Sequence, residues 1–271
     1  MIWSNYISCY SIIDTHVDRF DQSILKWGPT EMTEDITFPV IVKRGDLYAA
    51  PYGMEITALI RTARRMFQMS PRKANSLTTA SDLADHSVRT GRYVWLLVKA
   101  LSAKQLGELH VAPAVLVAGA ALHDIGKLSI PREILAKPAM LTKDEFAIVM
   151  RHPSAGYRIA TATLMQRGGT SEFLTCVAEV ALFHHERWDG AGYPNQVANK
   201  NIPLTARVLS VADVYDALTS ARAYKTRMPH REVVEVIRDG RGSKFDPDLV
   251  DAFLSVESDF ESENNESVGT E

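Results

Sequence analysis

Five of the eight histidines in the chain stand in acid-rich or glycine-rich settings where an imidazole could bind a metal ion. Histidine is the commonest nitrogen ligand for metals in proteins. Two aspartates accompany them, one beside a histidine and one inside the apolar stretch 208–218, where a buried carboxylate needs a cationic partner. The candidate metal ligands are His86, His123, Asp124, His152, His184, His185 and Asp213.

The ligand types narrow both the metal and the reaction. A single histidine on an apolar helix is more often a packed core or surface residue, so the argument depends on the joint pattern. Imidazole and carboxylate ligands without thiolates favour divalent transition metals, iron or manganese first with nickel and zinc as alternatives, over magnesium or calcium. Two such ions about 3.5–4 Å apart, sharing an aspartate, form a clamp for in-line displacement at phosphorus.

The composition is that of an ordinary globular protein, with 46% hydrophobic and 23% charged residues among 271. Cys9 and Cys176 stand far apart, which argues against a disulfide framework or a thiolate zinc site. Residues 255–271 carry acidic side chains and no basic ones, so the rest of the chain is mildly basic. Such a body suits a small polyanionic ligand and not duplex nucleic acid. With no apolar run of membrane-spanning length and no secretory signal pattern, we expect a cytoplasmic protein without a membrane span.

From about residue 82 onward the chain alternates helix-start and helix-stop signals, which predicts a mainly α fold. Prolines mark helix starts, a Thr–Glu pair forms a capping box, a serine precedes one helix and a glycine ends another. These signals are Pro113, Thr142 with Glu145, Ser171, Pro203, Pro229, Gly240 and Pro247.

The N-terminal part has a different pattern. Residues 36–48 predict two short strands around a turn, and a helix is expected from about residue 54 to 69. We therefore divide the chain into a small α+β region of unknown role (1–70), a polar linker (71–81), a helical domain (82–254) and an acidic disordered tail (255–271). The first region could sense an input, bind a signalling partner or form a homodimer.

Four segments of the helical part carry a resemblance to a known family. Residues 121–131, ALHDIGKLSIP, are similar to the HD signature, and residues 184–194, HHERWDGAGYP, resemble the element that separates HD-GYP proteins from other HD hydrolases. Residues 152–156, HPSAG, and 213–225, DVYDALTSARAYK, agree in order and spacing. The resemblance to this HD-GYP family of HD-domain phosphohydrolases covers about residues 82–254.

This resemblance implies an HD-type helical bundle that hydrolyses a cyclic dinucleotide, cyclic di-GMP first, to the linear dinucleotide and further to GMP. It assigns the seven candidates above as metal ligands, with Asp124 as the ligand shared by both ions. Asp82 and Asp216 would complete a third metal site, so two or three ions are expected. Residues implied at the substrate are Lys127 near the scissile phosphate, Tyr193 along the cleft, and Arg222 and Lys225 on the phosphates.

Two alternatives stay open at this point. One is an HD hydrolase for another nucleotide, such as an alarmone or a nucleoside triphosphate, although the Gly-Tyr-Pro loop counts against it. The other is a signalling adaptor that binds a cyclic dinucleotide or a partner protein without turnover. The complete ligand set argues against the adaptor, because a non-catalytic copy would be expected to have lost ligands.

Overall fold

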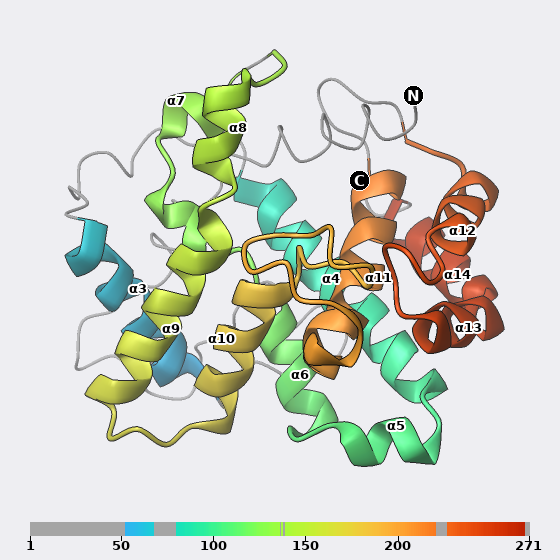
Figure 1. Cartoon of the computed structure of the whole chain (residues 1–271), viewed down its shortest axis with the longest axis horizontal. Coiled ribbons are helices and arrows are strands. Elements are labelled where there is room, and N and C mark those ends of the chain that lie inside the picture. The colour runs from blue at the N-terminus through green and yellow to red at the C-terminus, as the bar shows by residue number, and fades with distance from the viewer. Residues whose placement is uncertain (1–51, 68–79, 136, 138, 221–226, 269–271) are drawn as a thin grey trace.

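The computed structural model describes residues 52–67, 80–135, 137, 139–220 and 227–268, and these residues are mostly helical (Figure 1). None of the helices in this part of the chain is long and apolar enough to cross a bilayer. The elements are α3 (Gly53–Phe67), α4 (Ala80–Ala100), α5 (Ala103–Glu108), α6 (Pro113–Ala120), η3 (Ile125–Ser129), α7 (Arg132–Leu135), α8 (Lys143–Val149), α9 (His152–Gln166), α10 (Glu172–Phe183), η4 (Asn199–Asn201), α11 (Leu204–Thr219), α12 (His230–Asp239), α13 (Pro247–Ser255) and α14 (Glu257–Val268).

The predicted helix boundaries are confirmed at the residues that carry the signals. Thr142 is the N-cap of α8, and its hydroxyl accepts the Glu145 N–H at 3.2 Å while the Glu145 carboxylate accepts the Thr142 N–H at 2.7 Å. Ser171 caps α10 in the same way through Leu174. Prolines open or precede four helices and a glycine ends one: Pro113 (α6), Pro203 (α11), Pro229 (α12), Pro247 (α13) and Gly240 (α12).

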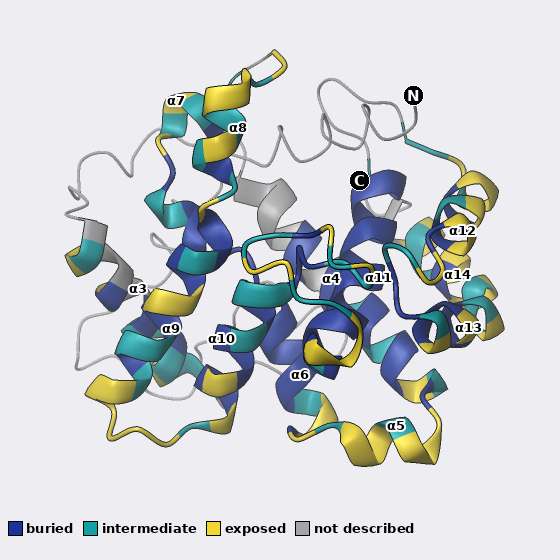
Figure 2. Ribbon diagram, in the orientation of Figure 1, coloured by how far each residue is buried: buried dark blue, intermediate teal, exposed yellow. Residues whose placement is uncertain are grey.

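Helix α11 lies at the centre of the core. All of its residues from Leu204 to Thr219 are buried, which matches a sequence that is apolar on nearly every face. It packs against α4, α10, α12 and α13. Figure 2 shows its buried residues in the middle of the molecule, while α5 and the outer faces of α12 and α13 are exposed. The central helix therefore carries its two aspartates, Asp213 and Asp216, into the interior.

A second group of elements, α9, α10 and η3, packs unusually closely through glycines. A Cβ added at Gly126 in η3 would lie 1.9 Å from the His152 carbonyl oxygen, and one at Gly156 would lie 2.9 Å from the Ala181 Cβ. Only a residue without a side chain fits at such an approach. The HD motif and the start of α9 are thereby held together, backbone against backbone.

Helix α3 belongs to this core. Ile56 and Leu59 are buried in it, Tyr52 stacks on Phe173 with ring centroids 4.3 Å apart, and the helix packs against α9 and η3. The sequence pattern assigns this segment to the N-terminal region 1–70, whereas in the structure the helix packs against elements of the helical domain. The two strands expected at 36–48 lie outside the described residues, as does nearly all of the proposed linker.

The acidic C-terminal segment also differs from its prediction. Residues 257–268 form α14, where Phe260 is fully buried and stacks on Tyr93 with ring centroids 5.0 Å apart. Arg92 of α4 donates to the Glu263 carboxylate at 2.6 Å. The expectation of a disordered tail is wrong over these residues, because one aromatic anchor and an ion pair hold the helix against the body.

Candidate metal centre

The structure brings all seven predicted metal ligands together. They come from five parts of the fold: α4 (His86), the turn between α6 and η3 (His123, Asp124), the first residue of α9 (His152), the end of α10 (His184, His185) and α11 (Asp213). Each is at most 8% exposed. The possible ligand atoms form three overlapping groups, and within each group they lie no more than 4.8 Å apart. The groups are His152, His184 and His185; His86, His123 and Asp213; and His123, Asp124 and His184.

Asp124 lies between the groups and joins them. Its Oδ2 is 3.2 Å from His123 Nε2, and its Oδ1 is 3.3 Å from His152 Nε2 and 3.7 Å from His184 Nε2. One carboxylate oxygen therefore faces each side of the cluster. This is the arrangement that a carboxylate shared by two ions requires.

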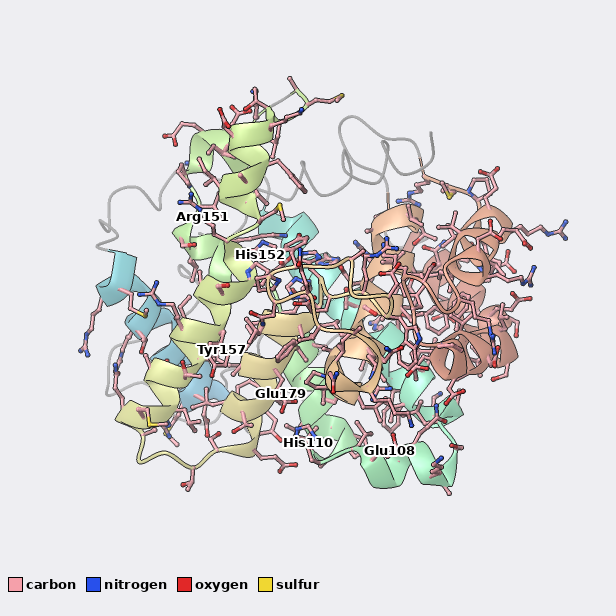
Figure 3. The ribbon with its side chains drawn as sticks, viewed as in Figure 1. Glu108, His110, Arg151, His152, Tyr157 and Glu179 are labelled. Carbon is pink, nitrogen blue, oxygen red and sulfur yellow. The ribbon has the colours of Figure 1, made fainter. Side chains whose placement is uncertain are left out.

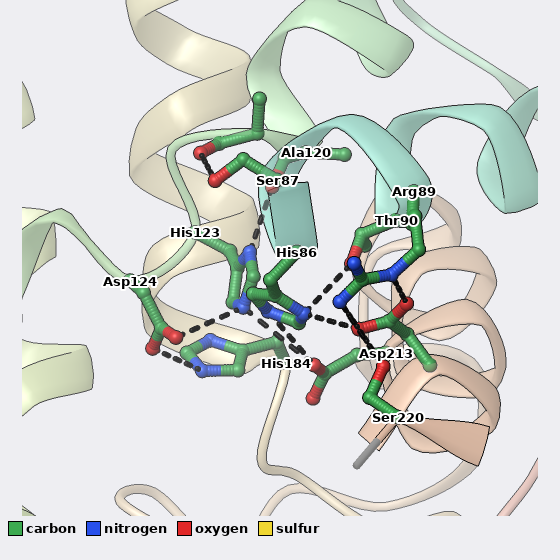
Figure 4. Close-up of polar contacts among 12 residues, drawn as sticks. His86, Ser87, Arg89, Thr90, Ala120, His123, Asp124, His184, Asp213 and Ser220 are labelled. Atoms are coloured by element: carbon green, nitrogen blue, oxygen red, sulfur yellow. Dashed lines mark hydrogen bonds and ion pairs between the residues drawn. The ribbon is translucent and has the colours of Figure 1, made fainter. Parts of the chain in front are cut away.

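Asp213 lies on the side of the cluster formed by His86 and His123. Its Oδ1 lies 3.5 Å from His86 Nε2 and 3.7 Å from His123 Nε2 (Figure 4). On the opposite side of Asp124, the Nε2 atoms of His152 and His184 are 3.2 Å apart, as are those of His152 and His185. The Nε2 atoms converge because each imidazole directs this nitrogen toward the centre of the cluster.

The backbone fixes that orientation. The Nδ1 atoms of three histidines lie within hydrogen-bond distance of carbonyl oxygens: His123 with Ala120 at 2.7 Å, His152 with Val149 at 2.8 Å and His184 with Val180 at 2.8 Å. A carbonyl can only accept, so Nδ1 must carry a proton and donate it. In the neutral ring this leaves the lone pair on Nε2, which faces the cluster and can bind a metal.

Protonation within the cluster follows from burial and from the two carboxylates. Burial lowers the pKa of His152, and burial followed by the neighbouring imidazoles holds the pKa of His184 and His185 well below the usual value. These three rings are neutral near pH 7. Burial also acts to lower the pKa of His123, but Asp124 and then Asp213 outweigh it and raise this pKa to about 9.

Asp124 is held ionised. Burial opposes its ionised form, but the charges of Lys127 and His123 hold the pKa of this carboxyl well below its usual range. Among the described residues, His86 Nε2, His123 Nε2 and Asp124 Oδ1 are buried polar atoms with no hydrogen-bond partner. Such atoms are costly unless something binds them, and divalent cations on the two sides of Asp124 would satisfy all three. The donor set therefore fits divalent metal ions.

Two substrate-site residues predicted from the resemblance also lie at the cluster. Lys127 is 2% exposed, and its Nζ donates to Asp124 Oδ2 at 2.6 Å. Tyr193 stacks on His185 with ring centroids 4.7 Å apart, and its N–H donates to the His185 carbonyl at 3.2 Å. Burial, and then the charges of Asp124 and Asp213, raise the pKa of the Tyr193 hydroxyl, so it stays protonated.

The other predicted residues are placed differently. Arg222 and Lys225 lie outside the described residues. Asp82 is in the first turn of α4, and its side chain is not described. Asp216 is fully buried behind His86, where it contacts Nδ1 of that ring at 2.7 Å. It does not face the cluster beside Asp213, so its place differs from that expected of a third-site ligand.

Sequence reasoning missed two residues that support the site. Arg89 donates from Nε to Asp216 at 2.6 Å, and Glu186 accepts the Asn195 N–H at 2.6 Å, which ties the Gly-Tyr-Pro loop to the end of α10. Arg89 follows His86 by three residues on the same helix face, which was the available signal. Of the histidines outside the cluster, His110 pairs with Glu179 at 3.0 Å, and Figure 3 shows that pair well away from His152.

Sequence comparisons relate the chain to a known family and to named relatives. The HD domain family matches residues 47–249. A Vibrio cholerae protein named "Cyclic di-GMP phosphodiesterase" is 44% identical over 178 residues, 65% of this chain and 36% of that protein. A Thermotoga maritima protein of the same name is 38% identical over 185 residues, 68% of this chain and 48% of that protein. The Vibrio cholerae "3'3'-cGAMP-specific phosphodiesterase 2" is 36% identical over 139 residues, 51% of this chain and 26% of that protein.

The family match covers most of the chain, so this chain belongs to the HD domain family. The resemblance to the HD-GYP group within that family is confirmed by the match and the relatives together. The predicted class, a mainly α HD-type bundle, is confirmed as well. The chain spans 36% of the first of these relatives and 48% of the second.

Proposed function

We propose that the protein is a metal-dependent phosphodiesterase that hydrolyses cyclic di-GMP to the linear dinucleotide and then to GMP. The observation that carries this proposal is the pair of ligand groups joined by Asp124, with the inward Nε2 atoms of the surrounding histidines. The printed names of the relatives support a cyclic dinucleotide as substrate.

The seven ligands would hold two divalent ions. His152, His184 and His185 would hold one ion, His86, His123 and Asp213 the other, and Asp124 would be shared. Iron or manganese suits this donor set best, with nickel or zinc as alternatives. Asp82 could contribute to the binding of a third ion. When bound, such ions polarise a phosphoryl oxygen and lower the pKa of a coordinated water.

The chain's own residues would position the substrate and compensate charge. Lys127, already held beside Asp124, would donate a charge-assisted hydrogen bond to a scissile phosphate oxygen as negative charge develops there. Arg222 and Lys225 would bind the phosphates, the guanidinium through a planar fork and the ammonium as a point charge. The protonated Tyr193 hydroxyl would donate a hydrogen bond to the substrate, and its ring keeps His185 in place by stacking.

Two features favour turnover over binding alone and a cyclic dinucleotide over other nucleotides. All seven ligand positions hold ligating residues in one buried cluster, which an adaptor would have no need to retain. The loop at residues 190–194 packs so tightly that a Cβ at Gly192 would lie 2.4 Å from the Arg187 nitrogen, and this loop places Tyr193 against the metal ligands. A homodimer or a signalling partner stays a prediction.

The test is turnover by the full chain after anaerobic loading with Fe²⁺ or Mn²⁺. Cyclic di-GMP and 3',3'-cGAMP are compared as substrates, products are separated by chromatography, and metal content is measured by elemental analysis. We expect linear dinucleotide from cyclic di-GMP and at least two metal equivalents per chain. A protein that holds two ions and binds cyclic di-GMP without cleaving it would support the adaptor instead, and cleavage of an alarmone alone would support the other alternative.

A further inference from the structure

His86 is contacted on both ring nitrogens by aspartates of the same helix. Asp213 and Asp216 are three residues apart, so they share one face of α11. Asp213 Oδ1 lies 3.5 Å from Nε2 of His86, and Asp216 Oδ2 lies 2.7 Å from Nδ1. The ring is therefore held between one carboxylate inside the metal cluster and one outside it. Figure 4 shows His86 with Asp213 and with Arg89, which lies on the outer side.

The outer carboxylate is itself fixed by Arg89. The Arg89 Nε donates to Asp216 Oδ1 at 2.6 Å, and its terminal nitrogen donates to Oδ2 at 3.3 Å and to the Ser220 hydroxyl at 3.0 Å. Asp216 is fully buried, and both of its oxygens are engaged by these contacts. A carboxylate paired with a guanidinium in this way offers only acceptor oxygens to His86.

We propose that Asp216 and Arg89 are positioning residues that hold His86 with its proton on Nδ1 and its lone pair on Nε2, toward the metal. This inference rests on the proposed dinuclear centre and assigns Asp216 to the support of His86, in place of a third metal site. The other cluster histidines with a described Nδ1 partner donate to backbone carbonyls. His86 donates instead to a carboxylate side chain, which orients the ring and can be altered by substitution.

Asp216→Asn separates this role from a general structural one. Arg89 Nε would keep the amide oxygen on its own side, so the amide NH₂ would face His86 Nδ1. That nitrogen would then have to accept, and the proton would move to Nε2, where it blocks metal binding. Removing Arg89 in the same protein, as Asp216→Asn with Arg89→Met, lets the amide turn its oxygen to His86 and restores the original tautomer.

The assay is titration of the metal-free full chain with Mn²⁺, with free Mn²⁺ measured by electron paramagnetic resonance. Asp216→Asn should weaken one of the two binding events by roughly 10- to 100-fold and leave the other nearly unchanged. The double variant should regain part of that loss, whereas a merely structural role predicts that it binds no better than the single variant. Asp246→Asn is the matched control, because it removes a buried carboxylate paired with Arg207 outside the metal cluster.

Nitrogen chemical shifts of the His86 ring give a second readout that needs no metal and no activity. Wild type should carry its proton on Nδ1 and Asp216→Asn on Nε2. Equal Mn²⁺ affinities in Asp216→Asn and wild type, or the same tautomer in both, would overturn the inference, as would fewer than two Mn²⁺ ions in wild type. Wild-type protein that holds two ions yet leaves cyclic di-GMP intact would refute the proposed function and leave the positioning result standing.

Discussion

The approach of Gly126 to α9 makes Gly126→Ala a sharp test of how the metal cluster is assembled. The added Cβ would lie 1.9 Å from the His152 carbonyl oxygen and 2.5 Å from the Gly156 nitrogen. Both are backbone atoms, so no side-chain rotation relieves the overlap. Ordinary contact begins near 3.4 Å, which leaves a shortfall of about 1.5 Å that η3 and α9 must absorb by moving apart.

That movement would change the distance between two of the proposed metal ligands. His152 Nε2 lies 3.3 Å from Asp124 Oδ1, and these two residues stand at the ends of the segments that would separate. A misplacement of about 1 Å can lower a reaction rate by roughly 100-fold. Overpacking of a core costs about 1–3 kcal/mol, which corresponds to a fall in Tm of roughly 2–12 °C for a chain of this size. We therefore expect a fall of roughly 100-fold in turnover together with this modest fall in Tm.

The assay compares Tm, Mn²⁺ affinity and cyclic di-GMP turnover in Gly126→Ala and in a matched control. Gly91 lies in α4, the helix that carries His86, and a Cβ there meets Val117 at an ordinary 3.6 Å. Gly91→Ala should behave as wild type. If Gly126→Ala binds two Mn²⁺ ions with wild-type affinity and turns over cyclic di-GMP at a comparable rate, the close packing does not set the ligand positions and the reasoning is refuted.

Three further predictions concern other parts of the chain. Asp124→Ala should abolish turnover while circular dichroism stays helical, because it removes the shared ligand; near-normal turnover by the metal-loaded variant would contradict that role. Arg222→Ala and Lys225→Ala should each raise KM for cyclic di-GMP by roughly 10- to 100-fold, Arg222 more, with metal content unchanged; an unaltered KM would place both outside the substrate site. Phe260→Ala should lower the free energy of unfolding by about 3–5 kcal/mol in urea denaturation, and the exposed Glu261→Ala by no more than about 0.5 kcal/mol; equal losses would argue against the packing of α14.

Much of the fold could be predicted from local signals because they act within one turn of a helix. Thr142 with Glu145 and Ser171 cap their helices through atoms three residues apart, so sequence spacing alone determines the contact. The seven candidate ligands could be predicted together because imidazoles and carboxylates in apolar surroundings need a cation or a hydrogen-bond partner. Neither inference requires knowledge of which distant segments meet.

The features that the sequence analysis missed depend on contacts between segments that are distant in the sequence. The segment 257–268 is acidic and offers little apolar surface, which is typical of disorder. Its helix is held by the Arg92–Glu263 ion pair and by Phe260, which enters an aromatic cluster built by Tyr93, Tyr215 and Phe253 from three other helices. Nothing local in the tail shows that this cluster exists, so composition alone gave the wrong answer.

The two aspartates of α11 illustrate the same limit at the site. Their spacing correctly predicts that Asp213 and Asp216 share a face, and both were treated as metal ligands. They differ in what other helices bring to them. Arg89 of α4 compensates the charge of Asp216 at 2.6 Å, whereas Asp213 faces the Nε2 atoms of two imidazoles at 3.5 and 3.7 Å. A carboxylate already paired with a guanidinium has less to gain from a metal ion than one among imidazoles. The partner supplied by a neighbouring helix is thus what distinguishes the proposed ligand, Asp213, from Asp216, the residue proposed to orient a ligand.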